Sequence, residues 1–193
     1  MRARRSPGAV LLAPGAGADR DQATLVAVDG ALSALGWTVE RMDFPYRKAG
    51  RRAPDRAPVL VASVVAAATA LARSSPGGLV LGGRSMGGRI CSMAVAEGLV
   101  PRARGLVLIS YPLHPPGRPD RLRTEHFPAI DVPCLFVSGT KDAFGTADAL
   151  ETATASIPGP VEHVWLDGGD HGLRRRDADV VAAVSAWAGR LPR

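Results

Sequence analysis

Short apolar runs alternate along this chain with longer segments in which apolar residues recur every three or four positions. The short runs cover residues 10–13, 37–42, 79–82, 106–109, 134–137 and 161–166. The longer segments cover about residues 22–35, 58–72, 88–97 and 178–190. Most short runs are apolar at consecutive positions, which indicates strands buried on both faces. Strands that alternate with helices predict a parallel sheet with helices on both sides.

The pattern therefore predicts an α/β fold, a three-layer sandwich around a mostly parallel, doubly wound sheet of about six strands. The chain has 193 residues and a mass of 20.1 kDa. That length fits one domain, covering residues 1–193, with a substantial core.

One long connection interrupts the alternation. Residues 111–133 carry six of the 16 prolines, so we expect a stiff loop at the carboxyl end of the preceding strand. Tyr111, Pro112, Leu113 and Phe127 are then expected to line a pocket wall. His114 is a further candidate for this wall. The alternative is a loop that simply packs on the rim of the domain.

A Gly-x-Ser-x-Gly motif, residues 83–87, joins a predicted strand to a predicted helix. The motif alone is a weak signal, but a strand that turns into a helix through it is typical of a nucleophile elbow. The serine must protrude from a strained turn, and the flanking glycines let strand and helix pass closely. Ser85 is therefore the candidate nucleophile.

An acid and a base follow Ser85 in the order expected of such an elbow, with Asp142 before His171. Each lies a few residues beyond an apolar run, where the carboxyl ends of parallel strands gather functional residues. His171 is expected to accept the proton of Ser85, and Asp142 to orient His171. Asp170 is adjacent to His171, but neighbouring side chains on a tight turn point apart, so we interpret it as a turn residue.

An oxyanion needs two hydrogen-bond donors. The amide of Met86, at the start of the helix, is the first candidate. The second is the amide of Ala16, in the glycine-rich loop after the first strand. Pro14 has no N–H and cannot serve. Gly15 lets this loop approach a substrate closely.

Together these motifs resemble the α/β-hydrolases, in particular a compact branch often labelled dienelactone-hydrolase-like. The resemblance spans about residues 10–187 and is most specific at 82–88, 110–117 and 139–142. It implies the strand order 2-1-3-4-5-6 and no cap domain. Sequences of this branch also resemble a noncatalytic-looking subunit of a eukaryotic histone-acetyltransferase (NSL) complex. The first loop usually reads His-Gly-Ala-Gly in the family, whereas this chain has Pro14 at the position of the histidine.

Charge and cysteine content add little to this interpretation. The formal net charge is +6, but the basic residues are scattered, so a solvated surface is expected rather than a specific nucleic-acid site. Cys91 and Cys134 are expected to be buried small residues rather than a disulfide. The apolar stretch after the basic start is too short for a signal peptide, and no later run approaches a membrane span. A cytoplasmic protein without a membrane partner is expected.

No metal-ligand spacing, phosphate-binding loop or dinucleotide fingerprint is present, so neither a metal nor a cofactor is expected. Two functional classes remain. The first is a serine hydrolase, esterase-like, that acts on a small-molecule acyl substrate as a monomer or homodimer. The alternative is a non-catalytic protein of the same fold that serves in binding or scaffolding.

Overall fold

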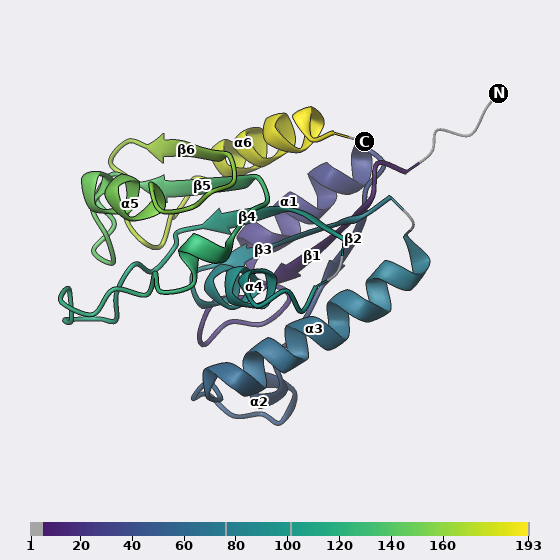
Figure 1. Cartoon of the computed structure of the whole chain (residues 1–193), viewed down its shortest axis with the longest axis horizontal. Helices are drawn as coiled ribbons and strands as arrows, with labels where there is room; N and C mark the ends of the chain where they lie inside the picture. Colours follow the sequence, from purple (N-terminus) through teal and green to yellow (C-terminus); the bar gives the residue numbers. More distant parts are fainter. Residues whose placement is uncertain (1–5, 76, 101, 193) are drawn as a thin grey trace.

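The computed structural model describes residues 6–75, 77–100 and 102–192. In that part of the chain, six parallel strands form one sheet in the order β2-β1-β3-β4-β5-β6 (Figure 1). The strands are β1 (Ala9–Ala13), β2 (Thr38–Arg41), β3 (Leu79–Arg84), β4 (Ala103–Ile109), β5 (Cys134–Gly139) and β6 (Val161–Leu166). The predicted parallel sheet and its strand order are confirmed.

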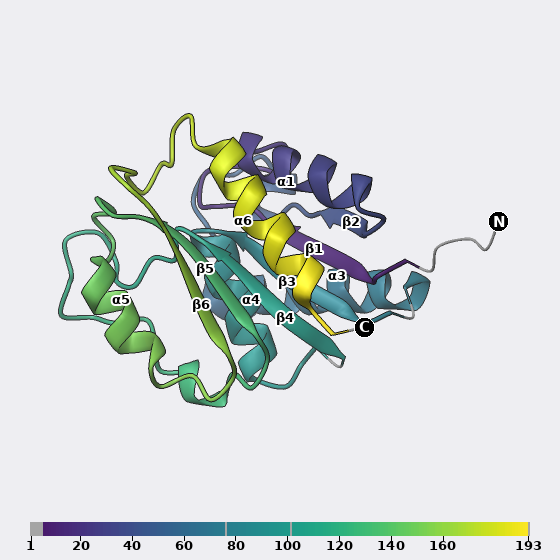
Figure 2. The same cartoon turned by 90° about the horizontal axis from the view of Figure 1, so that it is seen from above.

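Helices cover both faces of the sheet, which gives the predicted three layers. Figure 2 shows α1 and α6 on one side and α3, α4 and α5 on the other. The helices are α1 (Ala23–Ala34), α2 (Pro45–Lys48), α3 (Ala57–Ser74), α4 (Met86–Ala96), α5 (Ala147–Thr154) and α6 (Asp177–Arg190), with a 3₁₀ turn η1 (Phe127–Ala129). The short elements α2, η1 and α5 were not predicted.

Successive residues of the central strands enter opposite cores. In β3, Leu79 and Leu81 pack in the core beneath α3 and α4, whereas Val80 packs in the core beneath α1 and α6. The two-residue period of a strand thus fills two apolar layers, which explains the consecutive apolar positions of the sequence.

The long helix α3 corrects one expectation. It is long and apolar enough, by length and composition alone, to cross a membrane, so the statement that no run approaches a span was wrong. The reason is its alanine content, which keeps both faces apolar. In the structure its buried residues, among them Leu60, Val64 and Leu71, belong to the core shared with α4 and the sheet.

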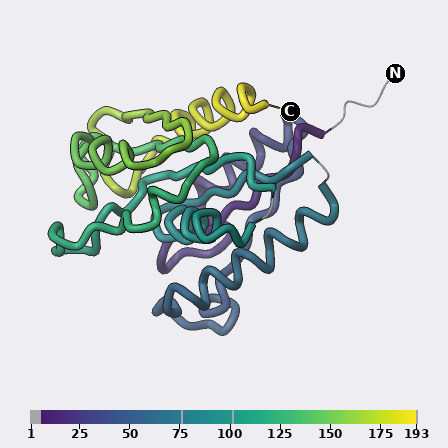
Figure 3. Tube along the Cα trace, viewed as in Figure 1, coloured from purple at the N-terminus to yellow at the C-terminus, as the bar shows by residue number. Residues whose placement is uncertain are grey.

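The connection from 111 to 133 begins in the core and then leaves it. In Figure 3 its first part extends away from the end of the sheet. Residues 116–122 are exposed, whereas Tyr111 is buried. The Tyr111 ring centroid lies 5.3 Å from that of Phe127 and 5.8 Å from that of Phe136. These aromatic contacts tie both ends of the loop to the sheet.

Candidate active site

Ser85 occupies a strained turn between β3 and α4. Its backbone has φ 49° and ψ −117°, a conformation that side chains rarely adopt. A Cβ on Gly83 or Gly87 would overlap the carbonyl oxygen of Ala13 on the neighbouring strand β1. The glycines are therefore required by the close approach of strand and helix, and the turn lifts the Ser85 side chain away from both.

Ser85, His171 and Asp142 form one hydrogen-bonded chain. Ser85 Oγ lies 2.8 Å from His171 Nε2. His171 Nδ1 lies 3.0 and 2.9 Å from the two carboxylate oxygens of Asp142. A carboxylate only accepts hydrogen bonds, so Nδ1 carries the hydrogen and Nε2 is left to accept the serine proton. Residues that are far apart in sequence thus meet because β3, β5 and β6 end at the same edge of the sheet.

The acid and the base are held by their own loops. Asp142 is buried, and its Oδ1 also accepts a hydrogen bond from the Phe144 amide at 2.8 Å. The Phe144 ring centroid lies 4.2 Å from that of His171. The two loops are joined by a hydrogen bond from the Lys141 amide to the Gly169 carbonyl oxygen, 2.8 Å long. The carboxylate is thereby fixed behind the imidazole.

Arg84, the residue before Ser85, contacts the loop that carries His171. Its Nη2 donates a hydrogen bond to the backbone carbonyl oxygen of His171 at 2.5 Å. Burial lowers the pKa of Arg84, while the carboxylates of Asp142 and Asp170 act in the opposite direction. The guanidinium group therefore links the elbow directly to the His171 loop.

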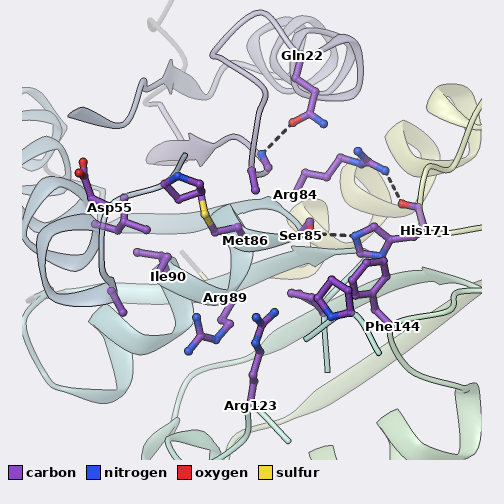
Figure 4. A pocket seen from close by; sticks show the side chains of 17 residues that line it. Gln22, Asp55, Arg84, Ser85, Met86, Arg89, Ile90, Arg123, Phe144 and His171 are labelled. Atoms are coloured by element: carbon purple, nitrogen blue, oxygen red, sulfur yellow. Dashed lines mark hydrogen bonds between the residues drawn. The ribbon is translucent and has the colours of Figure 1, made fainter. Parts of the chain in front are cut away.

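A cavity of about 470 Å³ opens over Ser85 (Figure 4). The amides of Ala16 and Met86 belong to residues of its wall. Met86 is the first residue of α4, so its amide has no acceptor within the helix, and the Ala16 amide donates to none of the described residues. The loop is fixed by Gln22, whose Oε1 accepts a hydrogen bond from the Gly15 amide at 3.1 Å. Within the described part of the chain, both amides expected to donate to an oxyanion are thus without an acceptor, and both belong to residues of the cavity that contains Ser85.

The residues of segment 111–133 are distributed differently from the prediction. Pro112 lines the cavity, as does Gly15 of the first loop. Tyr111, Leu113 and Phe127 do not, because their apolar side chains are buried in the core. His114 is also outside the cavity wall. Its ring packs near that of Phe144, with the centroids 6.5 Å apart.

The remaining candidates take structural positions. Asp170 is exposed and its carbonyl oxygen accepts from the Leu173 amide, as expected of a turn residue. Cys91 and Cys134 are free and buried. Burial raises the pKa of both thiols to about 12, so neither is a nucleophile near neutral pH. The described residues hold no group of three or more His, Cys, Asp or Glu side chains suited to a metal ion.

Several cavity residues were missed by the sequence analysis. They are Gln22, Asp55, Arg84, Arg89, Arg123 and Phe144. The helical spacing could have indicated Arg89, which lies one turn after Met86 on the helix that begins at the elbow. Arg123 and Asp55 lie in irregular segments, where no periodicity predicts the direction of a side chain.

A family model described as an alpha/beta hydrolase domain matches residues 6–188, and the chain therefore belongs to the α/β-hydrolase family. A serine hydrolase homologue from Coxiella burnetii has a TM-score of 0.78 and 17% identity, over 96% of this chain and 86% of that one. Dienelactone hydrolase from Anabaena variabilis has a TM-score of 0.78 and 20% identity, over 97% and 88%.

A serine hydrolase without a lid from Xanthomonas campestris has a TM-score of 0.77 and 20% identity, over 100% of this chain and 86% of that one. At these identities the likeness establishes a shared fold. The fold is an α/β-hydrolase without a lid, and its structural neighbours include proteins named as hydrolases and esterases.

Proposed function

We propose that this protein is a serine hydrolase that cleaves a small ester, thioester or other activated acyl bond without a cofactor. The observation that carries the proposal is the continuous chain from Ser85 Oγ through His171 to Asp142, with separations of 2.8 Å and 2.9 Å. The unpaired amides of Met86 and Ala16 beside it support the proposal, because they could stabilise a developing oxyanion.

The reaction proceeds in two halves. Ser85 Oγ attacks the acyl carbon while His171 Nε2 takes its proton, and the carbonyl oxygen becomes an oxyanion held by the two amides. The tetrahedral intermediate collapses, the bond to the leaving group breaks, and His171 gives the proton to that group. A water molecule, deprotonated by His171, then attacks the acyl-enzyme, and Ser85 leaves with its proton restored. Asp142 stabilises the imidazolium in both halves.

The alternative is a non-catalytic binding or scaffolding protein of the same fold. Pro14, where the family usually has histidine, favours this alternative, as does the resemblance to a subunit of a histone-acetyltransferase complex. The setting proposed for either class is the cytoplasm, with no membrane or specific nucleic-acid partner and with a monomer or homodimer as the active form.

Hydrolysis of 4-nitrophenyl acetate separates the two classes. The hydrolase proposal expects saturable turnover by the wild-type protein and loss of all but a trace of it in Ser85→Ala. The Ser85→Ala protein should remain folded, because the change removes one hydroxyl group and leaves the backbone unaltered. Equal rates for the two proteins would reject the proposed mechanism.

A further inference from the structure

Two arginine side chains from different elements meet in the cavity over Ser85. Arg89 lies on α4, one turn after Met86, and Arg123 lies in the 111–133 segment. Both line the same cavity, and Figure 4 shows their guanidinium groups next to each other. Burial lowers the pKa of Arg123, and the positive charge of Arg89 lowers it further. The two cations are therefore close enough to repel each other.

No carboxylate of the described residues forms an ion pair with either guanidinium group. Arg89 Nε is buried and has no hydrogen-bond partner in the described part of the chain. Asp55 also lines the cavity. Its Oδ1 is paired with Arg51 at 2.7 Å, and its Oδ2 has no hydrogen-bond partner among the described residues, but Figure 4 shows Asp55 away from the two arginines. Among the described residues, Arg89 and Arg123 thus bring two positive charges to the cavity, and neither is paired with a carboxylate.

The backbone under both arginines is fixed. Tyr111 Oη donates a hydrogen bond to the Arg123 carbonyl oxygen at 2.6 Å, and the Arg123 amide donates to the Leu113 carbonyl oxygen at 2.8 Å. Ser92 Oγ donates to the Arg89 carbonyl oxygen at 2.8 Å. Tyr111 and Leu113, expected in the cavity wall, instead hold the backbone of a residue that lies there. The backbone that carries the two side chains is therefore already ordered before a ligand binds, which lowers the conformational entropy that the protein loses on binding.

Two neighbouring cations in a partly dehydrated cavity cost free energy unless an anion offsets them. The planar guanidinium group donates paired hydrogen bonds that match the two oxygens of a carboxylate. We propose that Arg89 and Arg123 form a subsite for an anionic group, and that the acyl part of the substrate carries a carboxylate. This inference rests on the proposed function and adds the charge and chemical class of its substrate.

The position of His171 assigns the anion to the acyl part. His171 must reach the leaving group to protonate it, so the leaving group lies on the His171 side of Ser85. In Figure 4 the guanidinium groups of Arg89 and Arg123 lie on the Met86 side of Ser85, opposite His171. An acyl chain that extends from the Ser85 ester in that direction brings a terminal carboxylate to the two arginines.

Two matched pairs of esters test the inference. The first pair is the mono-4-nitrophenyl ester of glutaric acid and its methyl ester, which differ only in the acyl-side charge. The second pair is 4-butyryloxybenzoate and its methyl ester. In this pair the charged ester carries its carboxylate on the leaving group. Rates are corrected for hydrolysis in buffer, which the neighbouring carboxylate of the glutarate accelerates. The quantity compared is the ratio of kcat/KM for the charged and the neutral ester of each pair.

The wild-type protein should favour the charged ester of the first pair by about tenfold or more, as expected for hydrogen bonds to a charged group. Arg89→Met and Arg123→Met should each lower that ratio by about tenfold, since methionine keeps the apolar stem and removes the charge. Arg121→Met is the matched control, because Arg121 is exposed on the same loop and outside the cavity wall. Its ratio should stay within about twofold of wild type.

Three results would overturn the inference. The first is a wild-type kcat/KM for the charged ester of the first pair that is no higher than that for the neutral ester. The second is a loss of this preference in Arg121→Met that equals the loss in the two cavity variants. The third is a preference for the charged ester that depends on the arginines but occurs only in the second pair. Labelling of Ser85 by a fluorophosphonate probe is measured on the same preparations. An unlabelled wild-type protein would count against the hydrolase function itself, whereas a labelled protein without charge preference removes only the carboxylate subsite. Thermal unfolding of each variant shows whether it is folded.

Discussion

Arg84 Nη2 donates a hydrogen bond to the backbone carbonyl oxygen of His171, so the residue before the proposed nucleophile holds the loop that carries the proposed base. The sequence motif assigns this position no role. In the structure Arg84 joins the end of β3 to the segment after β6, and it is also one of the residues that line the cavity. We interpret Arg84 as a positioning residue that keeps the imidazole within reach of Ser85.

Arg84→Met should therefore lower kcat for 4-nitrophenyl acetate by about tenfold or more, because small displacements of a catalytic group are costly. Arg84→Lys should recover part of the loss, since a lysine can reach the same carbonyl oxygen. Steady-state kinetics on 4-nitrophenyl acetate check this. The readout is the kcat of Arg84→Lys divided by the kcat of Arg84→Met. An equal loss of kcat/KM in both variants, with KM raised and kcat unchanged, would assign Arg84 to substrate binding instead.

A pair of matched substitutions separates Asp142, the proposed acid of the triad, from Asp170. Asp142→Asn should lower kcat by several orders of magnitude, about 10⁴ in the serine-protease precedent, because the amide favours the wrong imidazole tautomer. Asp170→Asn should cost much less, since Asp170 is exposed and the His171 ring bonds to Asp142. Rates for both variants on one ester decide the matter, and a reversed order would contradict the assignment.

Stability at mildly acidic pH should depend on His126. Burial and the positive charge of Arg89 together lower the pKa of His126 to about 4, although the carboxylate of Glu125 acts in the opposite direction. In the unfolded chain the imidazole has its ordinary pKa of about 6.5, so between pH 6.5 and 4 the unfolded state binds more protons. The stability contributed by neutral His126 is thus present above pH 6.5 and is lost as pH falls toward 4.

The measurement is the free energy of unfolding in urea at several pH values for wild type and His126→Gln. The pH-dependent loss attributable to His126 should be about 1–2 kcal/mol, discounted because the side chain is only partly buried. The variant should show a shallower slope over this window. Identical slopes in the two proteins would mean that His126 titrates as it does in the unfolded chain.

Neutral acyl chains should be favoured only when they are short. The elements of the described residues include no lid over the cavity, and the side chains of Tyr111, Leu113 and Phe127 are buried in the core. Each fully enclosed methylene contributes about 0.8 kcal/mol, and an open site encloses few of them. We expect kcat/KM on 4-nitrophenyl esters to be greatest at about C2 to C4. Steady improvement to C10 or beyond would reveal an apolar tunnel.

The six strands and the elbow could be predicted from sequence because each obeys a local rule, although β3 and β5 extend two residues further than predicted and β4 begins three residues earlier. Runs of consecutive apolar residues indicated strands that are buried on both faces, between two cores. Ser85, Asp142 and His171 follow successive strands of the sheet, so their order along the chain indicated that they lie at the same edge. Helix α5 was missed although Thr146 caps it, with Oγ1 accepting from the Ala149 amide at 3.3 Å. Its eight residues are too few for a clear apolar period.

The wall of the cavity could not be predicted for a different reason. Segment 111–133 is mostly irregular, so no helical or strand period predicts the direction in which its side chains point. Which of them enter the core and which face the cavity is known only from the structure. The apolar Tyr111 and Leu113 enter the core, and the charged Arg123 is left in the wall. A wall of Tyr111, Pro112, Leu113 and Phe127 was expected, whereas in the structure this segment contributes Pro112, Pro116 and Arg123 to the wall.

The central claim is that Ser85 is an activated nucleophile, and covalent labelling tests it most directly. Native protein is treated with a fluorophosphonate probe, and the adduct is located by peptide mass spectrometry. The account predicts one adduct, on Ser85, that is absent from Ser85→Ala and forms much more slowly in Asp142→Asn. A folded wild-type protein that remains unlabelled, or an adduct that persists in Ser85→Ala, would contradict it.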